Sequence, residues 1–187
     1  MRTLGQMRRR VLALIEELDK GAEGMTNDVD IRAKFNDAAD LVQFELARLK
    51  KIPEYVEIDV EKGDVLRLKD IGDECGRSIF QLGNISGVQH ELRAAGTVLR
   101  VLQTGTMKID CFVYPQHIAE DTEDDHELEL SDDALGIMPW GIAAALLKND
   151  VSSDYGAAYR SQYEGMLQRL DSRVVMPGIY VEGGVDI

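Results

Sequence analysis

Apolar residues recur at helical spacing in the first fifty residues of the chain. Within residues 4–19, one stripe predicts an amphipathic helix that Gly21 and Gly24 bring to an end. A longer stripe, preceded by the capping residues Thr26-Asn27-Asp28, predicts a second helix that ends before Pro53. The stripes consist of Leu4, Met7, Val11, Leu14, Ile15 and Leu18, and of Ile31, Phe35, Ala38, Val42, Leu46 and Leu49.

The pattern changes to strict alternation after Pro53. Tyr55, Glu57 and Asp59 alternate with apolar residues, which is typical of a strand with one buried face. Gly83-Asn84, Gly96 and Gly105 are predicted turns between further short strands. Those strands are predicted at Val65–Leu68, Ser78–Leu82, Val88–Leu92, Thr97–Gln103 and Met107–Tyr114. Such evenly spaced strands predict an antiparallel sheet folded on itself, as a small sandwich or barrel.

Two further helices are predicted after residue 130. Ser131 is a suitable N-cap for the first, which contains the only Trp, and Pro139 either kinks this helix or begins it anew. Gly141 and the three alanines that follow Ile142 would let another helix approach closely. We expect this segment, from Leu135 to Leu147, to be the buried spine on which the first two helices pack.

The last predicted helix follows a polar turn at Asn149-Asp150 and carries three tyrosines. Tyr155, Tyr159 and Tyr163 are spaced at i, i+4 and i+8, so they share one side of the helix. Large amphipathic rings suit a subunit interface. They would equally suit packing on the chain's own core with the hydroxyls directed outward. Of the two last helices, we expect this one, from Tyr155 to Leu170, to form the outward face.

After residue 171, Pro177-Gly178 and Gly183-Gly184 disfavour a helix, and Ile179, Tyr180 and Val181 have strand character. Addition of this segment as a strand to a neighbouring chain would bury it, and fraying at the terminus is the alternative. The domain organisation that we predict is α+β. Residues 1–52 and 131–171 form an antiparallel bundle of about four helices. Residues 54–117 form an inserted β domain, residues 118–130 an exposed acidic linker and residues 172–187 an extended arm.

Composition narrows the class of protein. Of 187 residues, 44% are hydrophobic and 29% charged, as in soluble globular proteins. The net charge of −13 argues against a nucleic-acid-binding protein, which needs an excess of Lys and Arg. The longest apolar run, Gly141 to Leu147, is too short to cross a membrane, and the apolar run after Arg8–Arg10 is too short for an export signal.

Candidate chemistry is sparse. The sequence holds no G-x-S-x-G, HExxH, kinase or phosphate-loop motif, so we predict neither an enzyme nor a bound cofactor. His117 and His126 flank a run of acids that could be drawn as a metal site, but their spacing favours a plain acidic linker. His90 is predicted to be a half-exposed strand residue. Cys75 and Cys111 are expected to be buried or half-buried free thiols.

The order of these elements resembles that of head–tail connector proteins, also called adaptor or neck proteins, of tailed bacteriophages. The resemblance is carried by LGQMRRRVLALIEE, by TNDVDIRAKFNDAADLVQFELA with KKIPEYVEI, and by the Tyr114-Pro115 step. It is completed by PWGIAAALLKND with the tyrosine-rich helix and by the terminal YVEGGVDI. Compared with compact all-helical adaptors, the predicted β insertion is long, which leaves open whether the chain is an adaptor or a tail-completion or other neck protein.

The resemblance implies a structural protein of the virion, made in the bacterial host's cytoplasm. Family members form a ring, usually of twelve copies, docked below the portal protein, and present a platform to tail proteins. DNA would cross the channel of this ring without specific binding, in keeping with the acidic composition. Residues 172–187 would then be an arm that reaches towards the portal. An α+β enzyme or ligand-binding domain is the alternative from another class.

Overall fold

The computed structural model describes residues 2–18, 29–147 and 155–171. Over these residues the fold is α+β, with five α-helices and two small antiparallel sheets. The helices are α1 (Leu4–Leu18), α2 (Val29–Leu49), α3 (Leu68–Cys75), α4 (Asp132–Leu146) and α5 (Tyr155–Asp171), with a 3-10 turn, η2 (Ala94–Gly96). The strands are β1 (Ile52–Val60), β2 (Val65–Arg67), β3 (Ile79–Ser86), β4 (His90–Arg93), β5 (Val98–Val101) and β6 (Gly105–Val113). The α+β class predicted from the sequence is confirmed.

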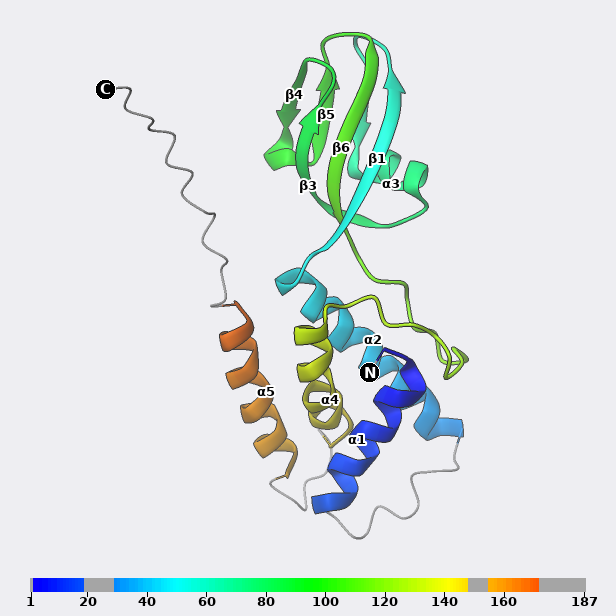
Figure 1. Cartoon of the computed structure of the whole chain (residues 1–187), viewed down its shortest axis with the longest axis vertical. Coiled ribbons are helices and arrows are strands. Elements are labelled where there is room, and N and C mark those ends of the chain that lie inside the picture. Colours follow the sequence, from blue (N-terminus) through cyan, green and yellow to red (C-terminus); the bar gives the residue numbers. More distant parts are fainter. Residues whose placement is uncertain (1, 19–28, 148–154, 172–187) are drawn as a thin grey trace, which may run out of the picture.

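Helices from both ends of the chain share one hydrophobic core, and we call this part the helical lobe (Figure 1). α4 contacts α1, α2 and α5, so it is the buried spine that its apolar composition predicts. Pro139 lies buried within α4, which continues through it from Asp132 to Leu146. The core includes the predicted stripes of the first two helices, among them Met7, Ile15, Phe35 and Leu46.

The strands form a second lobe, the sheet lobe, which lies above the helices in Figure 1. One sheet has the order β1-β6-β3 and the other β2-β5-β4, and all neighbouring strands are antiparallel. Val56, Met107 and Ile109 from the first sheet share a buried core with Leu99 and Val101 from the second. The described strands therefore pair as two three-stranded antiparallel sheets around one core, in outline the small antiparallel β domain that we predicted as a sandwich or barrel.

Two features of the sheet lobe differ from the prediction. Leu68, predicted to end a strand, begins the short helix α3 instead. Ile71 of this helix is fully buried, and Gly76 ends it in a left-handed conformation with φ of 66°. Gly83-Asn84, predicted to be a turn, lies inside β3, where the register against β6 shifts between Leu82 and Ile85. A bulge adds residues to one strand without ending it, so turn-forming residues were misleading here.

The two lobes meet at an aromatic cluster beside an ion pair. Tyr114, just after β6, packs between Phe44 of α2 and Phe80 of β3, with ring centroids 5.1 and 4.8 Å apart respectively. Arg77 donates to the backbone oxygen of Tyr114 at 3.0 Å and pairs with Glu129. Both charged side chains are mostly buried, so this contact joins the sheet lobe to the segment that follows it.

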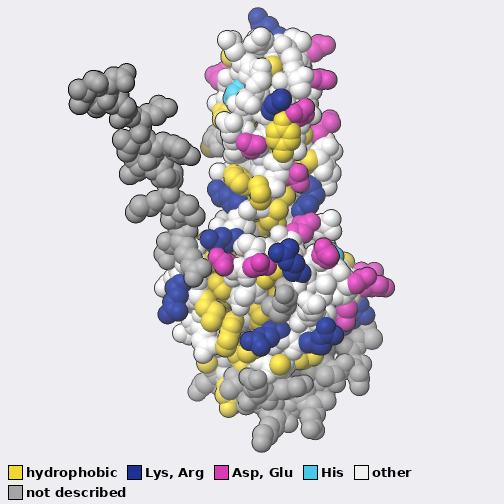
Figure 2. All heavy atoms as spheres, viewed as in Figure 1, with side chains coloured by type: hydrophobic (Ala, Val, Ile, Leu, Met, Phe, Trp, Pro, Cys, Tyr) yellow, Lys and Arg dark blue, Asp and Glu magenta, His cyan; other side chains and the backbone are white. Residues whose placement is uncertain are grey.

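The segment 118–130 is not the simple exposed linker that its composition predicts. Ile118, Leu128 and Leu130 are buried in the helical core, while the acidic side chains between residues 120 and 127 are exposed. Figure 2 shows acidic side chains gathered where this segment protrudes from the helical lobe. The acidic composition correctly predicts the solvated side chains, whereas the apolar residues on either side of them pack the two ends of the segment on the helices.

Polar side chains of α2 bind the start of this segment. Asn36 is fully buried, and its amide nitrogen donates to the backbone oxygens of Ala119 at 3.0 Å and Glu120 at 3.1 Å. One turn later, Asp40 accepts from the backbone nitrogen of Ile118 at 2.8 Å. Gln43, also buried, donates to the backbone oxygen of residue 116 at 2.8 Å. Buried hydrogen bonds of this kind hold a loop in one position because leaving them unmade is costly.

Among the described residues, no helix is both long and apolar enough to cross a bilayer.

Candidate functional site

The structure separates the three tyrosines that we expected to form an outward face. Tyr155 is exposed, with 40% of its surface accessible, whereas Tyr159 and Tyr163 are almost completely buried. The hydroxyl of Tyr159 donates to the backbone oxygen of Leu14 at 2.7 Å, and that of Tyr163 donates to Glu45 at 2.8 Å. The expectation of an outward face is therefore wrong for Tyr159 and Tyr163. Tyr159 bonds α5 to α1, and Tyr163 bonds α5 to α2.

The reason lies in the surface that α4 offers to α5. A side chain at Gly141 would collide with the ring of Tyr163, so only a bare backbone lets this ring lie so close. Tyr159 packs its ring against that of Trp140, with centroids 5.6 Å apart. Burial and the carboxylate of Glu45 both raise the pKa of Tyr163, so its hydroxyl stays a hydrogen-bond donor. These contacts make α5 part of the core.

The other predicted interaction residues, Ile179, Tyr180 and Val181, lie outside the described residues, as does the whole of the predicted arm, 172–187. The turn at residues 149–150 and the cap at residues 26–28 lie outside them as well.

The histidines and cysteines occupy structural positions. His117 pairs with Asp40 at 2.7 Å, and His90 is half-buried with its Nδ1 atom 3.0 Å from the backbone oxygen of Val88. Both cysteines are free, Cys75 half-buried and Cys111 buried, as we predicted. Burial, with a smaller contribution from nearby Cys75, raises the pKa of the Cys111 thiol to about 11. Over the described ranges, no three His, Cys, Asp or Glu side chains are grouped closely enough to hold a metal ion.

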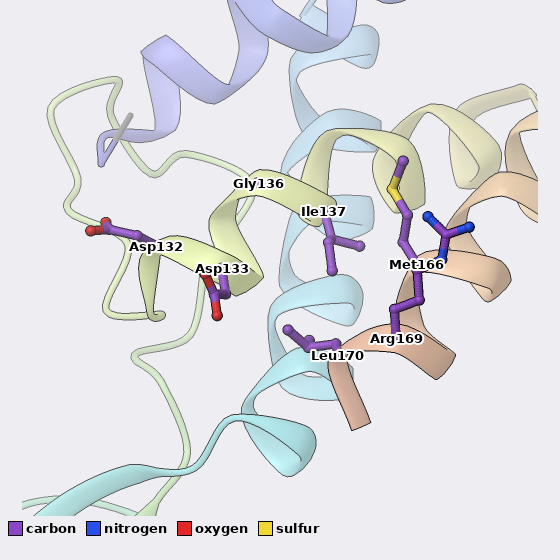
Figure 3. Close-up of a pocket in the computed structure, with 7 residues that line it drawn as sticks. All are labelled: Asp132, Asp133, Gly136, Ile137, Met166, Arg169 and Leu170. Atoms are coloured by element: carbon purple, nitrogen blue, oxygen red, sulfur yellow. The ribbon is translucent and has the colours of Figure 1, made fainter. Parts of the chain in front are cut away.

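An open pocket lies between the first turns of α4 and the last turns of α5 (Figure 3). Apolar side chains and Gly136 make up part of its lining, and two carboxylates and a guanidinium make up the rest. Its described lining residues are Asp132, Asp133, Gly136, Ile137, Met166, Arg169 and Leu170. The ionisable groups among these lining residues are the carboxylates of Asp132 and Asp133 and the guanidinium of Arg169.

The outer face of the first sheet carries an acidic patch, which we call the acidic face: Tyr55, Glu57, Asp59, Lys108 and Asp110. All five side chains are exposed, and cross-strand pairing places Tyr55 opposite Asp110 and Glu57 opposite Lys108. The hydroxyl of Tyr55 donates to Glu57, and this bond raises the pKa of Tyr55 to about 12. The same bond, and then Lys108, lowers the pKa of Glu57. Three carboxylates against one ammonium leave this face negative.

The outer face of the second sheet has the opposite charge. We call Val65, Arg67, Glu91, Arg93, Val98 and Arg100 the basic face, because these side chains alternate with those that face the core. Arg93 pairs with Glu91 at 2.8 Å, and this bond, with a smaller effect of Arg100, lowers the pKa of Glu91. Val65 is 55% exposed beside Arg100. Three guanidiniums against one carboxylate leave the face positive.

The acidic side of β1 was anticipated from the alternation of Tyr55, Glu57 and Asp59 with apolar residues, whereas the basic face was not. A signal was present, because Arg67, Arg93 and Arg100 each follow an apolar residue in a predicted strand. The strand order was needed to place all three on one face, since they come from three different strands. The net charge of −13 gave no indication that the outer face of the second sheet is positive.

A search of protein-family models finds none that matches the chain, and curated proteins give no match either, so its function has to be argued from its own fold and surfaces.

Proposed function

We propose that the chain is a non-enzymatic structural protein, a head–tail connector of a tailed bacteriophage. In this proposal it assembles as a ring of about twelve copies below the portal and links the capsid to the tail around the DNA channel. The proposed architecture is a bundle of four helices, α1, α2, α4 and α5, with the sheet lobe as an inserted domain. Its place of action would be the head–tail junction of the virion.

One observation carries this proposal. Helices from the two ends of the chain close a single core, and a sheet lobe with a core of its own extends from it. This is the order of elements on which the resemblance to connector proteins rests. Such a body offers separate surfaces for neighbouring copies, portal and tail, as an adaptor requires.

The distribution of perturbed groups favours binding over catalysis. Among the described residues, the carboxyl groups whose pKa is lowered, Glu57 and Glu91, lie on open sheet faces and owe the shift to neighbouring side chains of the same faces. Large apolar side chains are exposed on both lobes, with Leu41 of α2 at 72% and Val65 at 55%. Contact with another protein would remove these apolar side chains from water.

The direct test uses the portal protein encoded on the same genome. Purified portal rings and the full chain are mixed, and binding is followed by sedimentation velocity and electron microscopy. We expect a ring of the chain on one end of the portal. A chain that binds preformed connector–portal complexes but not the bare portal would instead be a tail-completion or other neck protein. Failure to bind either would contradict the proposal.

A deletion tests the proposed arm. Removing residues 174–187, which the sequence predicts to be extended, should abolish portal binding while the midpoint of thermal unfolding stays unchanged. Gln162→Ala, at an exposed position of α5 to which no interaction was assigned, is the control for a surface change on the helix that precedes the arm. Undiminished portal binding after the deletion would remove the arm from the proposal.

The pocket between α4 and α5 is the observation in favour of a ligand-binding domain. Its lining pairs Ile137 and Met166 with charged groups, so an amphipathic ligand would suit it. Soaking crystals in a fragment library tests this alternative. Specific density in the pocket, combined with an absence of portal binding, would favour it over the connector.

A further inference from the structure

The two outer faces of the sheet lobe carry opposite charge and expose apolar groups of similar kind. The acidic face includes Tyr55, which is 50% exposed, and the basic face includes Val65, which is 55% exposed. We propose that the basic face of one copy docks on the acidic face of the next copy, in a head-to-tail contact. This inference rests on the proposed connector function, because it names the contact through which the ring would close.

Geometry makes this contact suitable for a ring. The faces belong to different sheets whose inner sides share one core, so they point away from that core in different directions. One neighbour therefore cannot cover both faces of a given copy. Each copy would use one face towards each of two neighbours, and such a heterologous contact closes into a ring when the rotation between copies allows it.

Charge decides which pairing is favourable. Two acidic faces would repel each other, and so would two basic faces, which disfavours a two-fold dimer through either face alone. Across the unlike pair, three guanidiniums and one carboxylate would meet three carboxylates and one ammonium. Arg and Tyr are also the residue types most enriched among energetically dominant interface side chains.

Nucleic acid is the competing partner for the basic face. Arg93 is already paired with Glu91, and Val65 and Val98 occupy positions between the arginines. The face therefore offers few free cations for phosphates, and the chain as a whole carries a charge of −13. A partner that presents carboxylates beside an exposed ring fits better, and the acidic face of a second copy, with Tyr55 next to Glu57 and opposite Asp110, has that composition.

The test uses charge reversal on each face of the full chain. The basic-face variant carries Arg67→Glu and Arg100→Glu, and the acidic-face variant carries Glu57→Lys and Asp110→Lys. All four side chains are exposed, so the fold should tolerate the changes, which circular dichroism and thermal unfolding verify. Self-association is measured by sedimentation equilibrium at high protein concentration and low salt. We expect the wild type to associate, and each variant to associate at least about tenfold more weakly.

Mixing supplies the decisive comparison. The basic-face variant is acidic on both faces and the acidic-face variant basic on both, so an equimolar mixture should regain association. A chain with all four substitutions should also associate by itself. Reversal of the exposed pair Arg160→Glu and Glu164→Lys on α5 is the control and should leave association unchanged. If association is weak in either variant alone and is restored in the mixture, these two faces are identified as the contact between copies.

Three outcomes would overturn the inference. They are unchanged association of both variants, an absence of association in the wild type and in the mixture alike, and binding of duplex DNA that is lost in the basic-face variant. The portal assay separates this inference from the proposed function. If the chain binds the portal and neither charge reversal changes its self-association, only the face-to-face contact is rejected. Association that depends on the faces, without portal binding, rejects only the connector.

Discussion

The ring of Tyr163 lies against the backbone of Gly141, so close that a Cβ atom built on the glycine would be 2.8 Å from the ring carbon Cε2. The same added atom would stand 3.0 Å from a methyl group of Val42. α2, α4 and α5 therefore meet at this one position. The contact explains how a helix rich in tyrosine can be held against a helix rich in small residues.

Substitution of Gly141 with Ala should destabilise the protein. The added methyl group overpacks this three-helix contact, at a cost of about 1–3 kcal/mol in the free energy of unfolding. Gly136→Ala in the same helix is the matched control, because nothing lies within 4 Å of a Cβ atom there. That change should stabilise by about 0.5–1 kcal/mol through helix propensity. Chemical denaturation of both variants checks the prediction, which fails if Gly141→Ala is as stable as the control.

Removal of the Tyr159 hydroxyl should weaken the attachment of α5. Tyr159→Phe keeps the ring beside Trp140 but deletes the bond to the Leu14 oxygen, which should lower the free energy of unfolding by about 1–2 kcal/mol. Tyr155→Phe, at an exposed position, should change it by less than about 0.5 kcal/mol. Urea unfolding followed by Trp140 fluorescence measures both. Equal effects of the two substitutions would contradict the assignment of Tyr159 to the core.

Asn36→Ala should release the segment that begins after residue 115. The bonds from its buried amide to the Ala119 and Glu120 oxygens would be lost, at a cost of about 1–3 kcal/mol. Hydrogen exchange should accelerate at the Ile118 amide, which the neighbouring Asp40 holds. Asp37→Ala, one residue further along the helix and exposed, is the control. Unchanged exchange in Asn36→Ala would show that apolar packing alone fixes the segment.

Stability should decrease at alkaline pH in a way that depends on Cys111. Burial raises the pKa of its thiol from an ordinary 9.0 to about 11, so the folded state keeps the proton while the unfolded state loses it. The free energy of unfolding should therefore fall as the pH rises from about 9 to about 11. Cys111→Val removes this group and should flatten that part of the curve, whereas Cys75→Ala should retain it. Parallel curves for the wild type and Cys111→Val would refute the explanation.

The sequence determined the local elements of the fold more fully than the contacts between residues far apart in the chain. The amphipathic stripe of α1 and the alternation of β1 depend only on the spacing of apolar residues, and both elements form where the pattern predicts them. Ser131 stands at the N-cap of α4 and Asp132 in its first turn, again by local rules. The free state of Cys75 and Cys111 was likewise predictable from their isolation in the sequence. α3 was missed because its apolar residues, Leu68, Ile71 and Cys75, form only two turns of pattern.

Tertiary structure alone decided which polar and aromatic groups would be accessible. A tyrosine stripe has the same spacing whether it faces solvent or core, and the bare backbone of Gly141 is what draws Tyr163 inward. The composition of residues 120–127 predicts a free linker, and only the fold shows that the amide of Asn36 holds the backbone at Ala119 and Glu120. Arg67 and Arg100 become neighbours of one face only when β2 and β5 pair. Each of these facts is a contact between residues far apart in the chain, and spacing along the sequence carries no information about such contacts.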